Sequence, residues 1–380
     1  MRAVRVILTS QNLTKPIIYM TKASLRSSTP GGNNLRSSVA AVDGKNAATG
    51  YESGGHHEMQ LERDGTMRAV LFAIPVVLLL AAVSVFTGVG SLAASEDGRG
   101  WLLVVESRLP RTLALMLAGA GLAVSGTIMQ MLARNRFVEP STAGTAESAA
   151  LGMLLAMLIA PNLPVAGKMA FAALTALAGT ALFLQILRRV PLRSALMVPL
   201  IGLMLGGVVN AITTFIAYRY DLMQSMGAWM SGDFSVVLRG RYELLWIGFA
   251  LTLVAYATAA RFTVIGMGEA IARNVGLDYD KVVTLGLAIV SMVTATVVAT
   301  VGMIPFLGLV VPNIVSLTLG DNLRRTLPVI AIAGAGLVLA CDIVGRMVIA
   351  PYEVPVGTVM GVIGSIVFLY LLLSRRSHAG

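Results

Sequence analysis

Residues 261–281 read RFTVIGMGEAIARNVGLDYDK and form the one long polar interruption in the C-terminal half of a very apolar sequence. Apolar residues recur within it at helical spacing, which predicts a short helix with one apolar face: Met267, Ala270, Ile271 and Val275. A helix of two turns does not fold alone, so this face must pack against another surface. That surface is either the rest of this chain or a partner in the cytoplasm.

The polar residues of the same stretch sharpen this prediction. Glu269 and Arg273 are four apart in the favoured acid-first order, so we expect them to pair on the helix surface. Gly276 follows the last periodic residue, where a left-handed helix cap is expected.

The composition around this stretch indicates an integral membrane protein. Of the 380 residues 56% are hydrophobic and 13% charged, with a mean hydropathy of +0.79, whereas soluble domains carry about 25% charged residues. The apolar runs are long and continuous, so an all-α, polytopic fold is predicted. The net charge of +10 lies mostly in loops between spans. There it orients the chain in membrane lipid, and it is not taken as a sign of nucleic-acid binding.

Two regions of different character are expected. Residues 1–66 are rich in Ser, Thr, Asn and Gly and contain no apolar run of spanning length. They resemble a transit peptide only superficially, and we interpret them as a disordered or non-native extension, with Met67 as the other candidate start. Residues 67–376 form the predicted transmembrane domain.

That domain contains about ten candidate spans, since a span needs about 20 apolar residues. They lie at 68–88, 112–132, 144–160, 168–187, 195–217, 242–260, 282–301, 306–319, 328–349 and 357–373. Pro305 and Pro312 bracket the eighth, which is the least regular.

Loop charge favours an orientation with both termini in the cytoplasm, because basic residues accumulate on that side. Twelve basic residues then lie inside: Arg134, Arg136, Arg188, Arg189, Arg193, Arg261, Arg273, Lys281, Arg324, Arg325, Arg375 and Arg376. Eight lie outside: Arg99, Arg108, Arg111, Lys168, Arg219, Arg239, Arg241 and Arg346. The outer arginines therefore need a separate explanation.

Small and weakly polar residues share one face of the fifth span. They are Gly202, Gly206, Asn210 and Thr213 or Thr214. We interpret this face as the wall of a wide aqueous path, because Asn210 lies at membrane depth. Close helix packing is the alternative.

We predict no catalytic site, metal site or cofactor. The histidines His56, His57 and His378 all lie in the tails, and Cys341 is the single cysteine. Asp342 and Arg346 are four apart in the ninth span and are expected to pair. No G-x-x-x-x-G-K-[ST] sequence occurs, so ATP, if used, must be bound by another chain.

Six stretches, in the same order along the chain, resemble the iron-siderophore and cobalamin permease family. They are Arg108-Leu109-Pro110-Arg111; Ser125-Gly126 with Gln130; Asn135 to Pro140 with Gly144; Gly268-Glu269 with Ala272 and Gly276; Gly302 to Pro312; and Asp342 to Arg346 with Glu353 to Gly357. The resemblance covers about residues 67–376, and the wording of 134–148 and 310–328 is closest to the ferric-siderophore branch, of petrobactin, enterobactin or anguibactin type.

The resemblance implies the membrane subunit of a type II ATP-binding-cassette importer in the bacterial cytoplasmic membrane, not an enzyme. Its partners would be two ATPase subunits, a periplasmic or lipid-anchored substrate-binding protein, and a second copy or a paralogous permease. The substrate would be a ferric siderophore. Another chelate such as cobalamin or haem is the alternative, and an ion-coupled transporter is disfavoured because the spans contain few ionisable residues.

The resemblance also assigns roles to residues. Arg108, Arg111 and Arg346 would meet carboxylates of the binding protein. The alternative is interfacial anchoring for Arg108 and Arg111, and pairing with Asp342 alone for Arg346. Asn135 and Phe137 match the family's inner gate. Gly268, Glu269, Ala272, Arg273 and Gly276 lie in the matching coupling loop, which sits in the ATPase groove. The chain departs from the common pattern at Arg136, where many members have proline, and at Asn313, where many have histidine.

Overall fold

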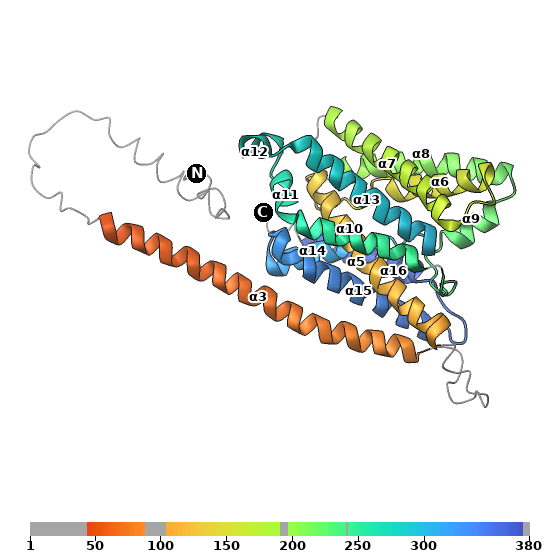
Figure 1. Cartoon of the computed structure of the whole chain (residues 1–380), viewed down its shortest axis with the longest axis horizontal. Helices are drawn as coiled ribbons and strands as arrows, with labels where there is room; N and C mark the ends of the chain where they lie inside the picture. The colour runs from red at the N-terminus through yellow and green to blue at the C-terminus, as the bar shows by residue number, and fades with distance from the viewer. Residues whose placement is uncertain (1–43, 88–103, 191–196, 241, 375–380) are drawn as a thin grey trace, which may run out of the picture. The chain divides into compact units, whose positions relative to one another are not determined.

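The structure is a computed structural model that describes residues 44–87, 104–190, 197–240 and 242–374. Helices account for most of these residues (Figure 1). In chain order they are α3 (Gly44–Phe86), η1 (Val104–Arg108), α5 (Leu109–Leu132), α6 (Thr145–Ile159), α7 (Val165–Arg189), α8 (Met197–Arg219), α9 (Met223–Trp229), η2 (Tyr242–Leu244), α10 (Leu245–Ala257), α11 (Ala259–Gly266), α12 (Glu269–Asn274), α13 (Tyr279–Val301), α14 (Leu307–Leu319), α15 (Leu323–Val348) and α16 (Val356–Ser374).

The chain divides into two units after His57, and the larger unit contains residues 58–380. Helix α3 begins at Gly44, upstream of Met67. The interpretation of residues 1–66 as an extension falls mostly on residues 1–43, which lie outside the described residues, and it stays a prediction.

A helix overlaps each predicted span, but the number of crossings is not fixed at ten. Of the described helices, six are long and apolar enough to cross a membrane, and the pair Tyr242–Ala257 and Ala259–Gly266, bent by 67°, adds at most a seventh. Three are shorter apolar helices: Thr145–Ile159, Leu307–Leu319 and Val356–Leu371.

Two of these short helices match the predicted spans to within one residue at each end: α6 follows the loop 133–144, and α14 follows the non-helical residues 302–306. At 1.5 Å per residue, a helix of about 15 residues spans about 22 Å, less than the roughly 30 Å of a bilayer core.

Helix α5 occupies the centre of the bundle, and 83% of an 18-residue apolar segment within residues 104–132 is buried. It packs against α10, α13, α14 and α15. Its contact with α14 is backbone against backbone, because a Cβ on Gly126 would lie 2.1 Å from the carbonyl oxygen of Gly308. Glycine on both helices therefore permits this approach.

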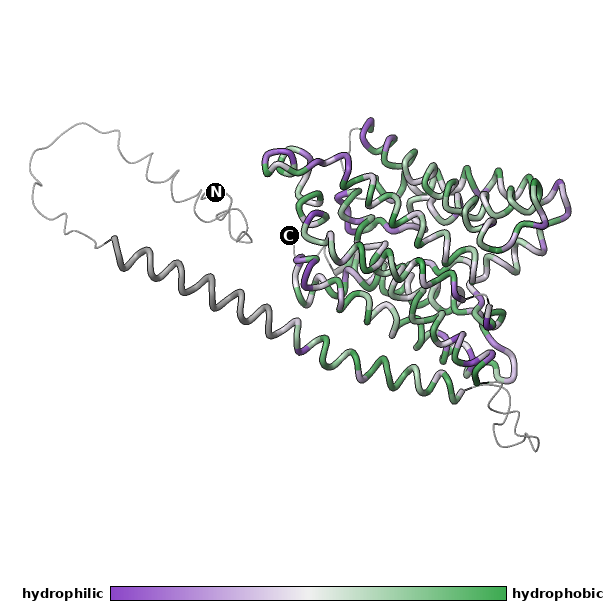
Figure 2. Tube along the Cα trace, in the orientation of Figure 1, coloured by the Kyte–Doolittle hydropathy of each residue, from purple (hydrophilic) through white to green (hydrophobic). Residues whose placement is uncertain are grey.

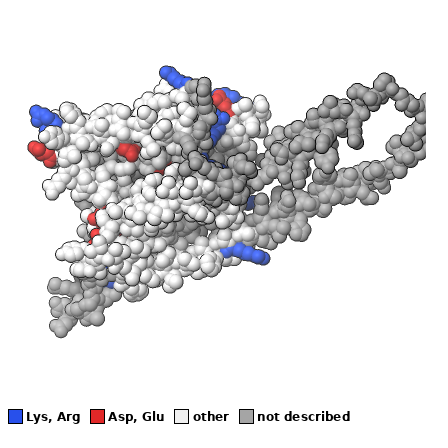
Figure 3. All heavy atoms as spheres, turned by 180° about the vertical axis from the view of Figure 1, so that it is seen from behind, with Lys and Arg blue, Asp and Glu red and all other residues white. Residues whose placement is uncertain are grey.

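The surface matches an apolar environment. Hydrophobic residues run along the helices, and hydrophilic residues gather at helix ends and in connecting segments (Figure 2). On the face drawn in Figure 3, charged side chains are few and lie mainly toward the edges of the described surface. Large apolar side chains such as Phe72, Leu203 and Phe215 are exposed on α3 and α8, as expected for helices that face lipid or another subunit.

Two ends of the bundle carry the candidate functional residues. We call them the α12 end, which contains α12 and the C-terminal end of α14, and the Arg346 end, which contains Arg346 in the last turn of α15 and the N-terminal end of α5.

Candidate functional site

The polar stretch 261–281 folds as the end of α11, the short helix α12 and the start of α13. α12 confirms the helix predicted from apolar spacing. Gly276 has φ +80°, which confirms the predicted left-handed cap. The N–H of Leu277 then reaches back to the carbonyl of Ala272 at 3.0 Å, so the last turn of α12 is closed by its own backbone.

The apolar face of α12 points away from the rest of the chain. Met267, Ile271 and Val275 are 40%, 40% and 45% exposed, while Ala272, the residue after Ile271, is fully buried. α12 therefore rests on its own chain through a small side chain and leaves its larger apolar side chains uncovered. Of the two surfaces predicted from the sequence, the described part of this chain leaves this face uncovered.

The charged residues of this stretch form exposed pairs. Arg273 Nε donates to Glu269 Oε1 at 2.9 Å, which confirms the predicted pair, and Arg273 Nη2 donates to Asp280 Oδ2 at 3.0 Å. The hydrogen bond to Glu269 is the largest cause of a raised pKa for Arg273. The side-chain hydrogen bond from Lys281 lowers the pKa of Asp278, whose carboxylate caps α13. Exposed pairs of this kind add little stability.

The loop 133–144, which carries the predicted gate residues, is tightly folded. Asn135 is buried, and its Oδ1 accepts the N–H of Phe137 at 2.8 Å. The ring of Phe137 meets the ring of Phe368 in α16 edge to face, with 6.0 Å between the ring centroids. The ring of Phe306 stacks on Phe368 at a centroid distance of 6.3 Å. Phe137 is therefore held in an aromatic cluster of its own chain.

Glu139 anchors this loop to the beginning of α14. Its buried carboxylate accepts the N–H of Phe306 at 2.7 Å and the hydroxyl of Ser141 at 2.5 Å. Its own N–H donates to Thr142 Oγ1 at 3.0 Å. The first N–H groups of a helix have no partner within the helix and favour a negative charge. Glu139 thus supplies the N-terminal cap that α14 lacks in its own sequence.

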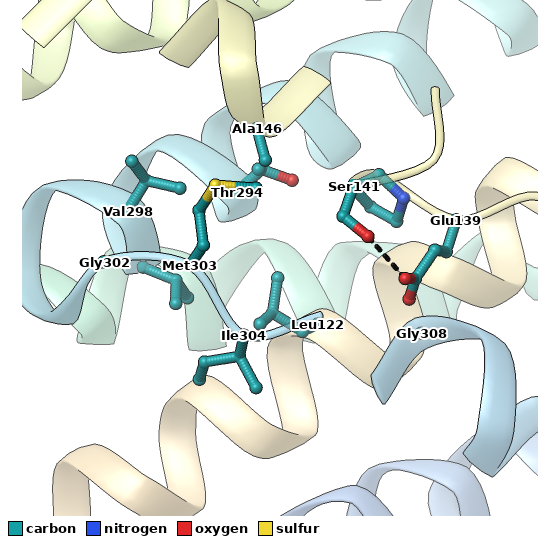
Figure 4. A pocket seen from close by; sticks show the side chains of 12 residues that line it. Leu122, Glu139, Ser141, Ala146, Thr294, Val298, Gly302, Met303, Ile304 and Gly308 are labelled. Carbon is teal, nitrogen blue, oxygen red and sulfur yellow. Dashed lines mark hydrogen bonds between the residues drawn. The ribbon is translucent and has the colours of Figure 1, made fainter. Parts of the chain in front are cut away.

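A small cavity lies beside Glu139 (Figure 4). Leu122, Thr294 and Met303 contribute to its lining, and Ser141 points toward Glu139 in the same view. Its volume of about 20 Å³ is enough for one water molecule. This cavity is therefore far too small to hold a metal chelate.

At the other end of the loop, Arg136 contacts the C-terminal half of α14 and the turn that follows. Its guanidinium pairs with Asp321, which also accepts the hydroxyl of Ser316. Asn313 Nδ2 donates to the carbonyl of Arg136 at 2.8 Å and to that of Leu309 at 2.7 Å. The arginine at the usual proline position thus leaves this part of the loop held by side-chain contacts.

The Arg346 end contains a buried network of charges. Arg346 pairs with Asp342, as predicted from their spacing. Arg111 Nη2 binds Asp342 Oδ1 at 2.7 Å, and Arg111 Nη1 binds Glu353 Oε2 at 2.7 Å. Arg346 also donates to the carbonyl and hydroxyl of Ser84, at 3.0 and 2.8 Å. The network joins α3, α5, α15 and the segment before α16.

This network changes the interpretation of the three outer arginines. Arg346 is only 8% exposed and the Arg111 side chain only 14%, because the ends of three helices converge on them. Arg108 is half-buried and donates to the carbonyl of Val85 at 3.2 Å. For Arg346 the geometry favours the alternative of pairing with Asp342, and for Arg111 it shows an internal pairing that the sequence did not predict. Contact with a binding protein stays a prediction.

The predicted polar face of α8 is divided. Gly202 and Gly206 are buried, and a Cβ on either would meet residues 142–147 of the preceding loop and α6. Thr213 is also buried and bonds the carbonyl of Val209 at 2.8 Å. Asn210, at the edge of this face, is exposed. For the three buried residues, close packing replaces the predicted wall of an aqueous path, because α6 begins directly beside them.

Sequence reasoning missed Glu139 and Glu353 as individual contributors. Glu139 stands between valine and proline in an otherwise uncharged segment, Phe137 to Ala146. A lone carboxylate in such a setting is a sign of a buried, hydrogen-bonded role. Glu353 was noted only as part of a family stretch.

Comparison with known proteins identifies the family. The model of the FecCD transport family matches residues 67–374. This chain belongs to the FecCD transport family. The resemblance inferred from the six stretches is thereby confirmed, as is the prediction of a transport subunit in place of an enzyme. The FecCD chain is accordingly an integral protein of the bacterial inner membrane.

Individual FecCD relatives are similar over most of their length. The petrobactin import system permease protein YclN of Bacillus subtilis (strain 168) is 46% identical over 308 residues, which is 80% of this chain and 98% of the relative. The ferric-anguibactin transport system permease protein FatD of Vibrio anguillarum is 44% identical over 298 residues, 77% of this chain and 95% of the relative.

A solved structure supports the same fold. A metal-chelate type ABC transporter in an inward-facing conformation superposes with a TM-score of 0.70 at 24% identity, over 81% of this chain and 99% of that chain. At this identity the likeness concerns the fold alone.

Proposed function

We propose that this chain is the permease subunit of an ATP-driven importer that carries an iron(III)-siderophore complex across the bacterial cytoplasmic membrane. The names of the petrobactin and ferric-anguibactin permeases, at 46% and 44% identity, support the substrate class. The structural observation that carries the proposal is the exposed apolar row at α12, formed by Ile271 of the helix and by the flanking Met267 and Val275, which the described part of this chain leaves uncovered.

The ATPase is the proposed occupant of that row. Five residues shape this segment. Gly268 and Gly276 have positive φ and turn the chain at either end of α12. Ala272 packs against the rest of the chain, and the ion pair of Glu269 and Arg273 lies on the surface of the helix. An apolar centre with a polar rim is the usual composition of a protein interface. Two ATPase subunits would serve a pair of permeases.

The proposed topology has ten crossings with both termini in the cytoplasm. Helices overlap all ten candidate spans, and the loop charges favour this orientation. The α12 end then faces the cytoplasm and the Arg346 end faces the substrate-binding protein, with the half-buried Arg108 beside the buried network.

A second permease, identical or paralogous, is proposed to cover part of α8. Leu203, Met204 and Val208 are more than half exposed beside the exposed Asn210. Asn210 on such a face would be placed between subunits, where a path for the chelate could run, with Asn135 and Phe137 as its inner gate.

The ATPase contact is tested by placing a charge in the apolar row. Ile271→Glu should lower the amount of ATPase subunit that co-purifies by about tenfold or more, as expected for a buried interface residue. Thr284→Glu introduces the same charge at an exposed position of α13, outside the row, and is the control. Equal losses in both variants, or none in either, would contradict docking through this face.

The substrate is tested by gene deletion in iron-starved cells. Uptake of one ferric siderophore, of petrobactin or anguibactin type, should be lost and restored by the wild-type gene but not by Ile271→Glu. Loss of cobalamin uptake alone would reassign the substrate. Transport by the purified chain in liposomes, driven by an ion gradient without ATPase, would contradict the importer mechanism.

A further inference from the structure

The loop 133–144 is fastened to α14 at two points of opposite character. The contact at Glu139 is buried and engages the first turn of α14. The contact at Arg136 is open to solvent, since the side chains of Arg136 and Asp321 are 38% and 49% exposed. The buried contact at Glu139 is therefore costly to break, whereas the exposed ion pair of Arg136 is not.

We infer that Arg136 and Asp321 form a latch, the Arg136 latch, which holds the predicted gate residue Phe137 in place and opens during transport. This inference rests on the proposed transport function and adds two residues, Arg136 and Asp321, that take no part in the gate as predicted from the sequence.

Neighbouring side chains orient both partners of the latch. Ser316 donates its hydroxyl to Asp321, and Asn313 donates to the backbone carbonyl of Arg136. Asn313 and Ser316 are three apart and therefore lie on the same side of α14. Gly320, with φ +82°, ends the helix and turns the chain so that Asp321 returns beside Ser316. The latch thus joins three segments: the loop 133–144, helix α14 and the turn that contains Asp321.

The position of the latch links it to Phe137. Arg136 directly precedes Phe137. Asn135, the residue before Arg136, accepts the N–H of Phe137 through its side-chain oxygen. Movement of the Arg136 backbone away from Asn313 must therefore shift the Phe137 ring from Phe368. Because an exposed ion pair is weak in water, the latch can release without unfolding the buried contact at Glu139.

The two departures from the common family pattern meet at this place. Arg136 stands where many members have proline, and Asn313 stands where many have histidine; the amide of Asn313 bonds the carbonyl of Arg136 at 2.8 Å. Proline restricts its own backbone and lacks an N–H. In this chain, side-chain contacts to α14 take over the task of fixing the loop.

Hydrogen exchange of the full chain in lipid nanodiscs tests the latch without ATPase or substrate. Arg136→Glu and Asp321→Arg should each speed exchange of the backbone amides of residues 135–143 by about two- to fivefold, the range for one exposed ion pair. The double variant Arg136→Glu/Asp321→Arg should restore the wild-type rate. Arg324→Glu, an exposed arginine two helical residues into α15, is the control and should leave exchange unchanged.

A rise in salt should speed the same amides in the wild type and not in Arg136→Gln, because only the former has a pair to screen. Unchanged exchange in both single variants, or a double variant as fast as the singles, would overturn the latch. With the ATPase bound, the single variants should also raise the ATP hydrolysed per chelate transported, and the double variant should restore it. An unaltered ratio in the presence of faster exchange would overturn the role of the latch in transport, while the importer function itself would stand.

Discussion

The two ends of the bundle use charge and apolar surface in opposite ways. At the Arg346 end, Arg111 and Arg346 are buried against Asp342, and Glu353 supplies the second carboxylate that balances their charge. At the α12 end, Arg273 and its carboxylate partners are more than half exposed, and the apolar row beside them is 40–45% exposed. The difference teaches that burial, more than residue type, separates a charge that holds helices together from one that is available to a partner.

The buried charges are stable only as a set. Each removal leaves an uncompensated charge in a medium of low polarity, whereas an exposed charge that loses its partner is simply hydrated. One isosteric substitution at each end therefore tests whether the two ends differ in this way.

The largest effect is expected for Asp342→Asn, which removes the carboxylate shared by Arg111 and Arg346. The loss should lower the free energy of unfolding by about 3–5 kcal/mol, the cost of breaking a buried ion pair. Thermal unfolding in detergent is the measurement. Asp280→Asn, which removes an exposed partner of Arg273 at the α12 end, is the matched control and should change the midpoint little. Similar losses at both ends would contradict the distinction.

The same comparison explains what the sequence could predict. The helix α12, its cap at Gly276, and the pairs Glu269–Arg273 and Asp342–Arg346 involve residues within a few positions of each other. Helical periodicity specifies such contacts. They were all predicted.

The contacts that were not predicted join distant parts of the chain. Arg111 and Asp342 are 231 residues apart, and Glu139 and Phe306 are 167 apart. No periodicity relates such positions, and only the packing of α5 against α14 and α15 brings them together. The close packing of Gly202 and Gly206, given from the sequence only as the alternative, depends in the same way on a tertiary feature, the start of α6 beside Gly206.

A middle-sized effect is expected for Gly276→Val at the α12 end. A β-branched residue in the left-handed region costs about 1–2 kcal/mol, and this cost should appear as local fraying of α12 while the midpoint of global unfolding stays nearly constant. Hydrogen exchange of residues 269–277 would report it, and ATP hydrolysis should become less well coupled to transport. Gly276→Asn keeps the same backbone accessible and is the control; equal fraying in both variants would show that φ at this position is not the cause.

The smallest effect concerns the solvent edge of the Arg346 end. Glu353 is 26% exposed and binds Arg111 Nη1, while Arg111 keeps Asp342 as its buried partner. Glu353→Gln should therefore lower stability by less than about 1 kcal/mol. It also leaves Arg111 Nη1 without its carboxylate.

The same variant decides whether this end serves only the fold. If a carboxylate of the binding protein meets Arg111, removal of the competing Glu353 should tighten docking by about two- to fivefold, and more at low salt than at high salt. Arg108→Glu should weaken docking under the same conditions. Calorimetric titration of the binding protein into the permease complex measures both. If neither substitution changes the affinity, the arginines at this end hold helices together and take no part in docking, because a partner carboxylate at either position would feel the altered charge.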